Sequence, residues 1–174
     1  MKQQVMRSLT CHLIGQDLDM RNKVITEGFM KNEAFLQQQG FGYEFSGSTI
    51  VTVMVNGNKL VSANAGDSRA VLGSLKDKDY IPKKEESKAL CVEEYDRQWV
   101  AIPITRDHKP DEPDEQQRII ERGGRIDSYK GRFGENVGPM RVWLKKEAFP
   151  GLAMSRSIGD ACAHSVGVIA DPGK

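Results

Sequence analysis

The spacing of apolar residues predicts a helix near the start of the chain. Between positions 22 and 39, apolar side chains recur at intervals close to the helical repeat and are separated by Lys, Glu and Gln. The apolar positions are Val24, Ile25, Phe29, Phe35 and Leu36. Gly40 follows this run, so we expect an amphipathic helix that ends there.

Two apolar runs after this helix predict a β-hairpin. Residues 49–55 are almost all Ile, Val, Thr or Met, residues 59–63 form the second run, and the Asn56-Gly57 pair between them is typical of a type I′ turn. Residues 69–75 can add a third strand and so form a meander. The strands are apolar at both alternating sets of positions, so we expect both faces to be covered, as in a layered α/β sandwich.

Three further segments differ in their patterns. Residues 76–97 are rich in charge and predict a surface loop or insertion, to which we assign no function. Residues 99–105 predict a strand that Pro103 interrupts, which an edge strand tolerates. Residues 126–150 mix Gly, Arg and aromatic residues without a clear period, which predicts a long, structured loop.

Residues 111–122 carry the start and stop signals of a second helix. Asp111 is the expected N-cap, Pro113 lies in the first turn, and the glycine pair that follows is the expected stop. Ile119 and Ile120 are expected to face inward.

Composition restricts the classes of function. The 174 residues suit a single domain. Lys and Arg number 25 against 24 Asp and Glu, so a net charge of +1 gives no whole-chain argument for binding nucleic acid or an acidic membrane surface. The three cysteines lie far apart, which suits neither a disulfide framework nor a paired-cysteine metal site. No run approaches the roughly 20 apolar residues of a membrane helix, and we expect an intracellular protein, cytoplasmic or nuclear.

Short motifs carry the chemistry that the sequence offers. They are residues 46–49 (SGST) before a strand, 66–71 (GDSRAV) in a turn, 107–110 (DHKP) before a helix, and 152–160 (LAMSRSIGD). In this order they resemble the metal-dependent Ser/Thr protein phosphatases of type 2C. We interpret residues 1–174 as one partial catalytic domain, of which roughly residues 20–172 resemble the family. Residues 138–144 look like the mobile flap of the family.

The resemblance implies a fold and a reaction. The fold is α+β, a four-layer α-β-β-α sandwich, which agrees with the doubly covered strands expected above. The family hydrolyses phosphoserine and phosphothreonine in proteins with a water activated by two Mg²⁺ or Mn²⁺ ions, and these ions prefer oxygen ligands. The resemblance therefore implies a phosphoprotein as the partner and a monomer when the domain is complete.

The sequence departs from the family at the principal metal ligands. The family holds them in an Asp-Gly-His-Gly stretch before this region and in Asp-Gly and Asp-Asn stretches after it, and this sequence contains no Asp-Gly or Asp-Asn dipeptide. Mg²⁺ needs several anionic oxygens, so this chain alone is not expected to form the two-metal centre. We expect a fragment, incomplete at both ends, that has little or no activity by itself.

The resemblance implies roles for individual residues. Asp67 matches an aspartate at a third, weaker metal site, and the alternative is an Asp that fixes its own turn. Ser48 and Thr49 match positions near that metal and its water, although hydroxyls that open a strand are commonly structural. Arg156 and Asp160 match a signature that shapes the floor of the site, for which buried pairing and turn formation are the simpler explanations. No catalytic residue is assigned.

Other polar residues have structural interpretations. For Arg69 we prefer an ion pair over a phosphate clamp. His108 is expected to fix the loop before the second helix rather than to act as an acid or base. His12 and His164 have no partners at the spacing of zinc ligands.

Two other functions remain as alternatives. Residues 66–70 (GDSRA) are one residue from the Gly-x-Ser-x-Gly elbow of α/β-hydrolases, which would make Ser68 a nucleophile. The residues after Ser68 are typical of a strand, whereas that elbow leads into a helix, so we rank Ser68 first as a residue that lines the metal site. The other alternative is an inactive phosphatase-like module that binds a partner through its flap or its charged insertion.

Overall fold

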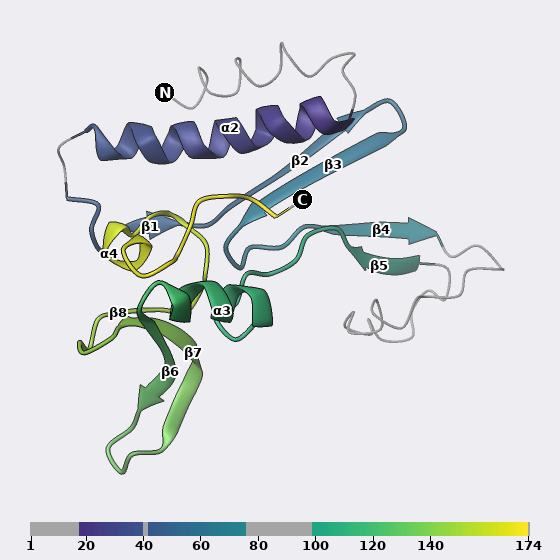
Figure 1. Ribbon diagram of the computed structural model, residues 1–174. Coiled ribbons are helices and arrows are strands. Elements are labelled where there is room, and N and C mark those ends of the chain that lie inside the picture. The colour runs from purple at the N-terminus through teal and green to yellow at the C-terminus, as the bar shows by residue number, and fades with distance from the viewer. Residues whose placement is uncertain (1–17, 40–41, 76–98, 174) are drawn as a thin grey trace.

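The helix α2 (Leu18–Gln37) lies along the hairpin of β2 (Ile50–Asn56) and β3 (Lys59–Ala65) (Figure 1). This computed structural model describes residues 18–39, 42–75 and 99–173. Four buried apolar side chains form the core between helix and hairpin: Ile25, Phe29, Ala63 and Ala65. The expected helix and hairpin are confirmed, while the predicted helix stop at Gly40 lies outside the described residues.

The turn of this hairpin differs from the predicted type. Asn56 pairs with Lys59, so the two loop residues are Gly57 and Asn58. Gly57 has a φ of 60°, while Asn58 is not at positive φ. A type I′ turn needs positive φ at both positions, whereas a glycine alone at the first position is the requirement of type II′.

The predicted three-stranded meander is wrong. The strand β4 (Val71–Leu75) pairs with β5 (Trp99–Pro103) and not with β3. The free edge of β3 has another partner, because the backbone of Asn64 exchanges two hydrogen bonds with Gly173, of 3.0 and 2.8 Å. At Asn64 the edge of β3 is therefore occupied by a segment from the far end of the chain and not by the sequence neighbour β4.

The expectation that the strands are covered on both faces is also not met in the described residues. Several large apolar side chains of β2 to β5 are exposed: Val53, Val55, Leu60, Val71, Leu72, Leu75 and Trp99. The described architecture is mixed α+β, with one packed face on the first hairpin.

The expected loop over residues 126–150 is instead mostly sheet. The strands β6 (Gly124–Lys130), β7 (Asn136–Leu144) and β8 (Pro150–Leu152) form an antiparallel sheet in that order. The register of β6 against β7 shifts between Ser128 and Tyr129. Such a bulge changes which side chains face the core, so the apolar residues keep no single period that a sequence pattern could show.

The helix α3 (Pro113–Glu121) packs on this sheet. Its N-cap is Glu112 and not Asp111, and the cap makes no side-chain hydrogen bond. Pro113 takes the first helical position as predicted. Ile119 is fully buried, but Ile120 is 53% exposed, so only one of the two expected inward isoleucines faces the core.

A second core joins α3 and the sheet to the end of the chain. Its buried members are Ile119, Val142, Ala163, Val166 and Val168. The short helix α4 (Ala161–His164) lies beside this core, and β9 (Ile158–Gly159) before it pairs with β1 (Gly47–Ser48). The pairing of β1 with β9 connects the second core to the residues that precede the first hairpin.

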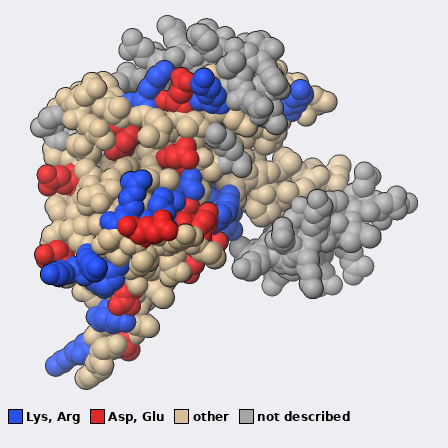
Figure 2. Space-filling view, viewed as in Figure 1, with Lys and Arg blue, Asp and Glu red and all other residues tan. Residues whose placement is uncertain are grey.

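Acidic and basic side chains lie next to each other on the face shown in Figure 2. Ion pairs of this kind include Arg106 with Asp114, which the structure places in contact independently of this view. Among the described helices, none has the length and hydropathy that a bilayer crossing requires.

The neighbours Ile119 and Ile120 provide a matched test of this packing. Ile119→Ala should lower the free energy of unfolding by about 2–4 kcal/mol, because it leaves a cavity in the second core. Ile120→Ala removes the same atoms from an exposed position and should change it by less than about 0.5 kcal/mol. Urea unfolding of both variants measures the difference, and equal losses would contradict the observed orientation of α3.

Candidate functional site

Two short loops carrying the second and third motifs are joined residue by residue. The carbonyl of Gly66 accepts a hydrogen bond from the His108 amide at 3.0 Å, and the Gly66 amide donates to Nδ1 of His108 at 3.3 Å. On one side of this contact, Lys109 Nζ donates to Asp67 Oδ2 at 2.5 Å. On the other side, Arg69 donates to both carboxylate oxygens of Asp107, at 2.9 and 2.8 Å. Arg69 therefore forms the ion pair preferred from the sequence.

Gly66 is required by its conformation and by its neighbours. Its φ is 110°, a value that side-chain-bearing residues rarely adopt. A Cβ there would also collide with the side chain of Thr49 and approach the carbonyl of Arg156. The backbone of the GDSRAV turn is thus enclosed by residues of the first and fourth motifs.

The hydroxyls of the first two motifs are only partly brought together. Thr49 Oγ1 and Ser68 Oγ lie 2.7 Å apart and share a hydrogen bond. Ser48 is exposed, and its hydroxyl donates to the carbonyl of Thr49 at 3.0 Å. Thr49 is therefore joined to the residue that follows Asp67, while Ser48 is exposed and takes no part in this contact.

His108 is a buried structural residue. The residue is 2% exposed, and its carbonyl accepts a hydrogen bond from the Ser155 amide at 3.0 Å. Burial lowers the pKa of His108, and the nearby positive charge of Arg156 lowers it further. The neutral ring accepts from Gly66 and holds the two loops together, as expected from the sequence.

The residue that the sequence interpretation missed is Glu115. Its carboxylate is fully buried and lies at the centre of a network that joins α3 to the fourth motif. Arg156 donates to it through Nη2 at 2.5 Å and Nε at 3.0 Å, Arg118 Nη2 donates at 2.6 Å, and the Ser155 hydroxyl at 2.6 Å. One signal was available, because Glu115 lies one helical turn before the buried Ile119 and so shares its face.

The network determines the charge of this buried carboxyl group. Burial alone would raise the pKa of Glu115, but the hydrogen bonds from Arg118, Arg156 and Ser155 outweigh burial. The pKa of Glu115 is therefore held far below its ordinary value, and the group stays ionised. Arg156 thus has the buried structural pairing that was the simpler explanation for it.

Asp160 has different neighbours. Its backbone is left-handed, with a φ of 51°, and its amide donates to the carbonyl of Ser46 at 2.9 Å. Its carboxylate packs against Gly47, where a Cβ would collide with it. Burial raises the pKa of Asp160. Beside it, the Gly159 amide donates to the buried Glu33 at 2.8 Å, so this corner connects α2 to the fourth motif.

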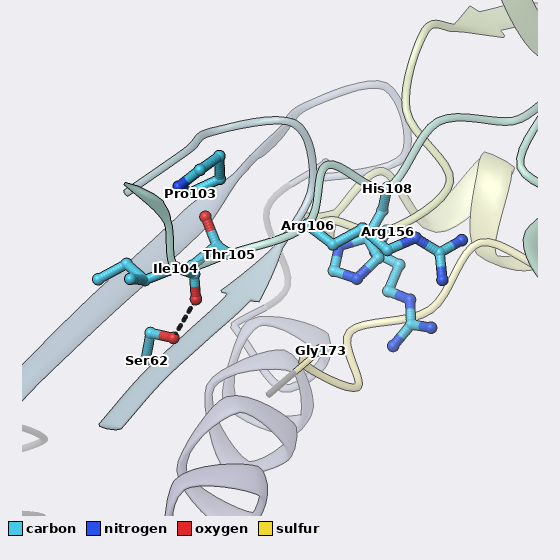
Figure 3. A pocket seen from close by; sticks show the side chains of 8 residues that line it. All are labelled: Ser62, Pro103, Ile104, Thr105, Arg106, His108, Arg156 and Gly173. Atoms are coloured by element: carbon cyan, nitrogen blue, oxygen red, sulfur yellow. Dashed lines mark hydrogen bonds between the residues drawn. The ribbon is translucent and has the colours of Figure 1, made fainter. Parts of the chain in front are cut away.

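A hollow of 420 Å³ opens beside these loops (Figure 3). Its lining residues are Ser62, Pro103, Ile104, Thr105, Arg106, His108, Arg156 and Gly173. Both arginines are engaged elsewhere: Arg106 pairs with Asp114 and Glu112, and Arg156 with Glu115 and the carbonyl of Asp171. Two arginines therefore line the hollow, and both donate hydrogen bonds to carboxylates or a carbonyl of the protein itself.

Comparison with known proteins decides the family. Residues 15–173 match the family profile described as Protein phosphatase 2C. The chain belongs to the protein phosphatase 2C family. The match includes all the motifs that the fold brings together around Gly66 and His108.

Plant proteins are similar to this chain in sequence, and one solved structure is similar to it in fold. Probable protein phosphatase 2C 12 of Oryza sativa subsp. japonica is 41% identical over 74% of this chain and 27% of its own length. Probable protein phosphatase 2C 72 of Arabidopsis thaliana is 39% identical over 79% of this chain and 35% of its length. The crystal structure of serine-threonine phosphatase 2C from Toxoplasma gondii superimposes with a TM-score of 0.68, at 18% identity, over 98% of this chain and 52% of that one. The solved structure supports the fold, and the chain spans about a third or less of these two plant relatives.

The described residues do not by themselves fit the two-metal centre of the protein phosphatase 2C family. Within residues 18–39, 42–75 and 99–173, no three His, Cys, Asp or Glu side chains gather as a metal site. At Asp67 the structure offers one carboxylate, which already accepts from an ammonium group. Mg²⁺ and Mn²⁺ need more oxygen ligands than this.

The serine-hydrolase alternative is not supported by the fold. Ser68 lies in a turn that leads from β3 into β4, whereas a nucleophile elbow leads from a strand into a helix. The hydroxyl of Ser68 bonds to Thr49, and the nearby His108 is occupied by Gly66. Neither contact provides the base that such a nucleophile requires.

Glu115→Gln tests the buried network. The variant leaves two arginines with a weaker partner and should lower the free energy of unfolding at pH 7 by about 3 kcal/mol. Because the folded-state pKa of Glu115 is depressed, its contribution is complete above its ordinary value of 4.5 and is lost as the pH falls below it. The gap between wild type and variant should therefore narrow from pH 5 towards pH 3.

Chemical denaturation across this pH range measures the gap. The exposed Glu121, in the same helix, provides the matched control, and Glu121→Gln should cost less than about 0.5 kcal/mol at any pH. A gap for Glu115→Gln that is constant with pH would show that folding does not depress the pKa of Glu115, which would contradict the described network.

Proposed function

We propose that the chain contributes part of the catalytic domain of a protein serine/threonine phosphatase, an enzyme that hydrolyses phosphoserine and phosphothreonine in proteins. The observation that carries the proposal is the family match across residues 15–173, over which separate motifs converge on one pair of joined loops. The metal-dependent chemistry of the family, hydrolysis by a Mg²⁺- or Mn²⁺-activated water, is the reaction class proposed.

In this proposal the described residues hold the loops, and carboxylates outside them complete the metal centre. The Glu115 network fixes the fourth motif, and the contacts of His108 fix the GDSRAV turn against it. Asp67 is the one described residue that we assign to metal, as a ligand of a third, weaker site. Ser68 and Thr49 line this site, while Ser48 and Asp160 support the backbone around it.

The complete domain is proposed to be a four-layer α-β-β-α sandwich. The exposed apolar side chains of β2, β4 and β5 support this proposal, since such strands need a second layer against them. The superposition on about half of the Toxoplasma gondii phosphatase is compatible with a second layer supplied by the remainder of a complete domain. We further propose an intracellular, monomeric enzyme, in keeping with the separated cysteines.

One observation favours a second function. Asp67 is paired with a lysine, and the described residues gather no metal-binding cluster. An inactive phosphatase-like module that binds a protein partner would have the same fold without requiring the metal centre. Activity measurements separate the two functions.

The test is Mn²⁺-dependent hydrolysis of p-nitrophenyl phosphate and of a phosphothreonine peptide. The chain alone should release no phosphate above background, because one carboxylate does not hold the ions. A polypeptide extended at both ends by its natural flanking sequence should be active. In that extended form Asp67→Asn should lower kcat about tenfold at subsaturating Mn²⁺, a loss of roughly 1.4 kcal/mol of transition-state stabilisation.

The outcomes distinguish the proposals. Strong Mn²⁺-dependent activity of the chain alone would contradict the requirement for further ligands. Inactivity of both forms would favour the binding module. Labelling of Ser68 by a fluorophosphonate probe would revive the serine-hydrolase alternative.

A further inference from the structure

We propose that Glu33 and His164 form a buried ion pair, in which the His164 ring carries a second proton against the Glu33 carboxylate, and that this pair positions the fourth motif against α2. No metal ion and no step of the proposed reaction is needed for this role. From the sequence, His164 had no partner at the spacing of zinc ligands, and the fold gives it a partner on a distant helix.

The two side chains face each other from separate helices. Glu33 belongs to α2 and His164 to α4, which lies below the C-terminal end of α2 in Figure 1. The Nδ1 atom of His164 is 3.8 Å from Oε1 of Glu33, and the two side chains are 18% and 6% exposed. The groups therefore interact largely out of water, where charges act more strongly on each other.

The other ring nitrogen of His164 shows where one proton lies. Nε2 is 3.1 Å from the carbonyl oxygen of Ser157. A carbonyl oxygen only accepts hydrogen bonds, so Nε2 carries a hydrogen. In a neutral ring Nδ1 would then have only a lone pair, and that lone pair would face the Glu33 carboxylate. A second proton, on Nδ1, replaces this repulsion with attraction.

Glu33 has one carboxylate oxygen with a partner and one without. Oε2 accepts a hydrogen bond from the Gly159 amide at 2.8 Å. Among the described residues, no group donates to the buried Oε1. A buried carboxylate oxygen without a donor costs free energy. Imidazole is a stronger base than a carboxylate, so the proton that serves both groups belongs on Nδ1 of His164, which donates to Oε1 as the two atoms close to hydrogen-bond distance.

A second buried carboxyl group lies near the pair. Asp160 is 8% exposed and directly precedes α4. Burial raises the pKa of Asp160, His164 lowers it and Glu33 raises it. With a neutral His164, this corner would hold two buried carboxylates, which repel each other. An imidazolium ion beside both carboxylates balances their charge.

Two other titratable groups of the described residues around α4 are directed elsewhere or uncharged. Burial and Glu44 raise the pKa of the Cys162 thiol, so Cys162 is uncharged at pH 7. Arg141 extends from β7, a strand that packs against α4, and donates to the carbonyl of Gly151. The neighbouring strand β8 carries no titratable residue. Of these groups, His164 is the one that can supply the balancing charge.

The pair holds the backbone of the fourth motif at two points. Glu33 accepts from the Gly159 amide, and His164 donates to the Ser157 carbonyl. Between these points begins β9, which pairs with β1 of the first motif. The pair thus fixes the fourth motif to α2 and, through β9, sets its position relative to the first motif.

The test measures the protonation of the His164 ring directly. In the ¹⁵N-labelled chain at pH 7, long-range ¹H–¹⁵N spectra separate protonated from unprotonated imidazole nitrogens. We expect the protonated type at both Nε2 and Nδ1 of His164. His108 provides the reference in the same spectrum, because its Nδ1 accepts from the Gly66 amide and is unprotonated. If the chain alone does not give the spectrum of a folded protein, the polypeptide extended by its natural flanking sequence is measured instead.

Glu33→Gln tests the partner of the proton. The variant keeps an oxygen that can accept from the Gly159 amide but removes the charge, so Nδ1 of His164 should change to the unprotonated type while Nε2 stays protonated. Glu44→Gln is the matched control, because it removes an exposed carboxylate near α4 and should leave both ring nitrogens unchanged.

Amide hydrogen exchange tests the positioning role. His164→Gln keeps a side-chain donor but loses the cation, so exchange at the Gly159 amide should become about tenfold faster, because its acceptor Glu33 has lost its counterion. Exchange at the His108 amide, which donates to Gly66, should change by less than about threefold. An equal increase at both amides would indicate general destabilisation and would contradict a local positioning role.

Each outcome supports or overturns a stated part. An unprotonated Nδ1 of His164 in the wild type, as in His108, would overturn the ion pair. A protonated Nδ1 that persists in Glu33→Gln would show that Glu33 does not hold the proton, and the pairing would be wrong. If exchange at Gly159 is no faster in His164→Gln, the ion pair does not position the fourth motif.

Discussion

The fold around the site depends on one buried carboxylate. Glu115 is an ionised group without solvent contact, and an unpaired charge in that position would cost several kcal/mol. The chain must therefore bring Arg118, Arg156 and Ser155 to it, which attaches α3 to the fourth motif. The Ser155 amide in turn donates to the carbonyl of His108. The position of the loop before α3 thus follows from the position of the Glu115 network.

As a consequence, the backbone of the two joined loops is held in place, and charged side chains extend from it. Gly66 and His108 are buried and joined through both backbone and ring. The charged side chains of Asp67 and Lys109 extend from these fixed positions towards solvent, where an ion pair has a small net free energy. The stability of the loops therefore resides in the buried contacts between Gly66 and His108 rather than in the partly exposed ion pairs beside them.

Local patterns predicted the elements whose signals are local. The first hairpin and the helix with Pro113 at its start follow from neighbouring residues, and both were predicted. The meander was wrong because Gly173, more than one hundred residues away, occupies the edge of β3 at Asn64. The sheet after α3 was missed because a bulge interrupts its alternation. Glu115 was missed because its partners Ser155 and Arg156 are distant in sequence, while the role of Asp67 came from the family resemblance alone.

The same reasoning explains a prediction that was right about the sequence pattern and wrong about the described structure. Apolar residues at both sets of positions in β2 and β4 indicate strands covered on two sides, yet Val55 and Val71 are 70% and 53% exposed. Apolar residues on a face of a strand indicate that another layer covers that face in the complete fold. Leaving apolar rows of this extent exposed to water costs free energy. The pattern is therefore best explained as one half of an interface, and it supports the sandwich independently of the site. The exposed apolar rows and the single carboxylate at Asp67 are separate observations, and the proposal that this chain forms one part of a larger domain explains both of them.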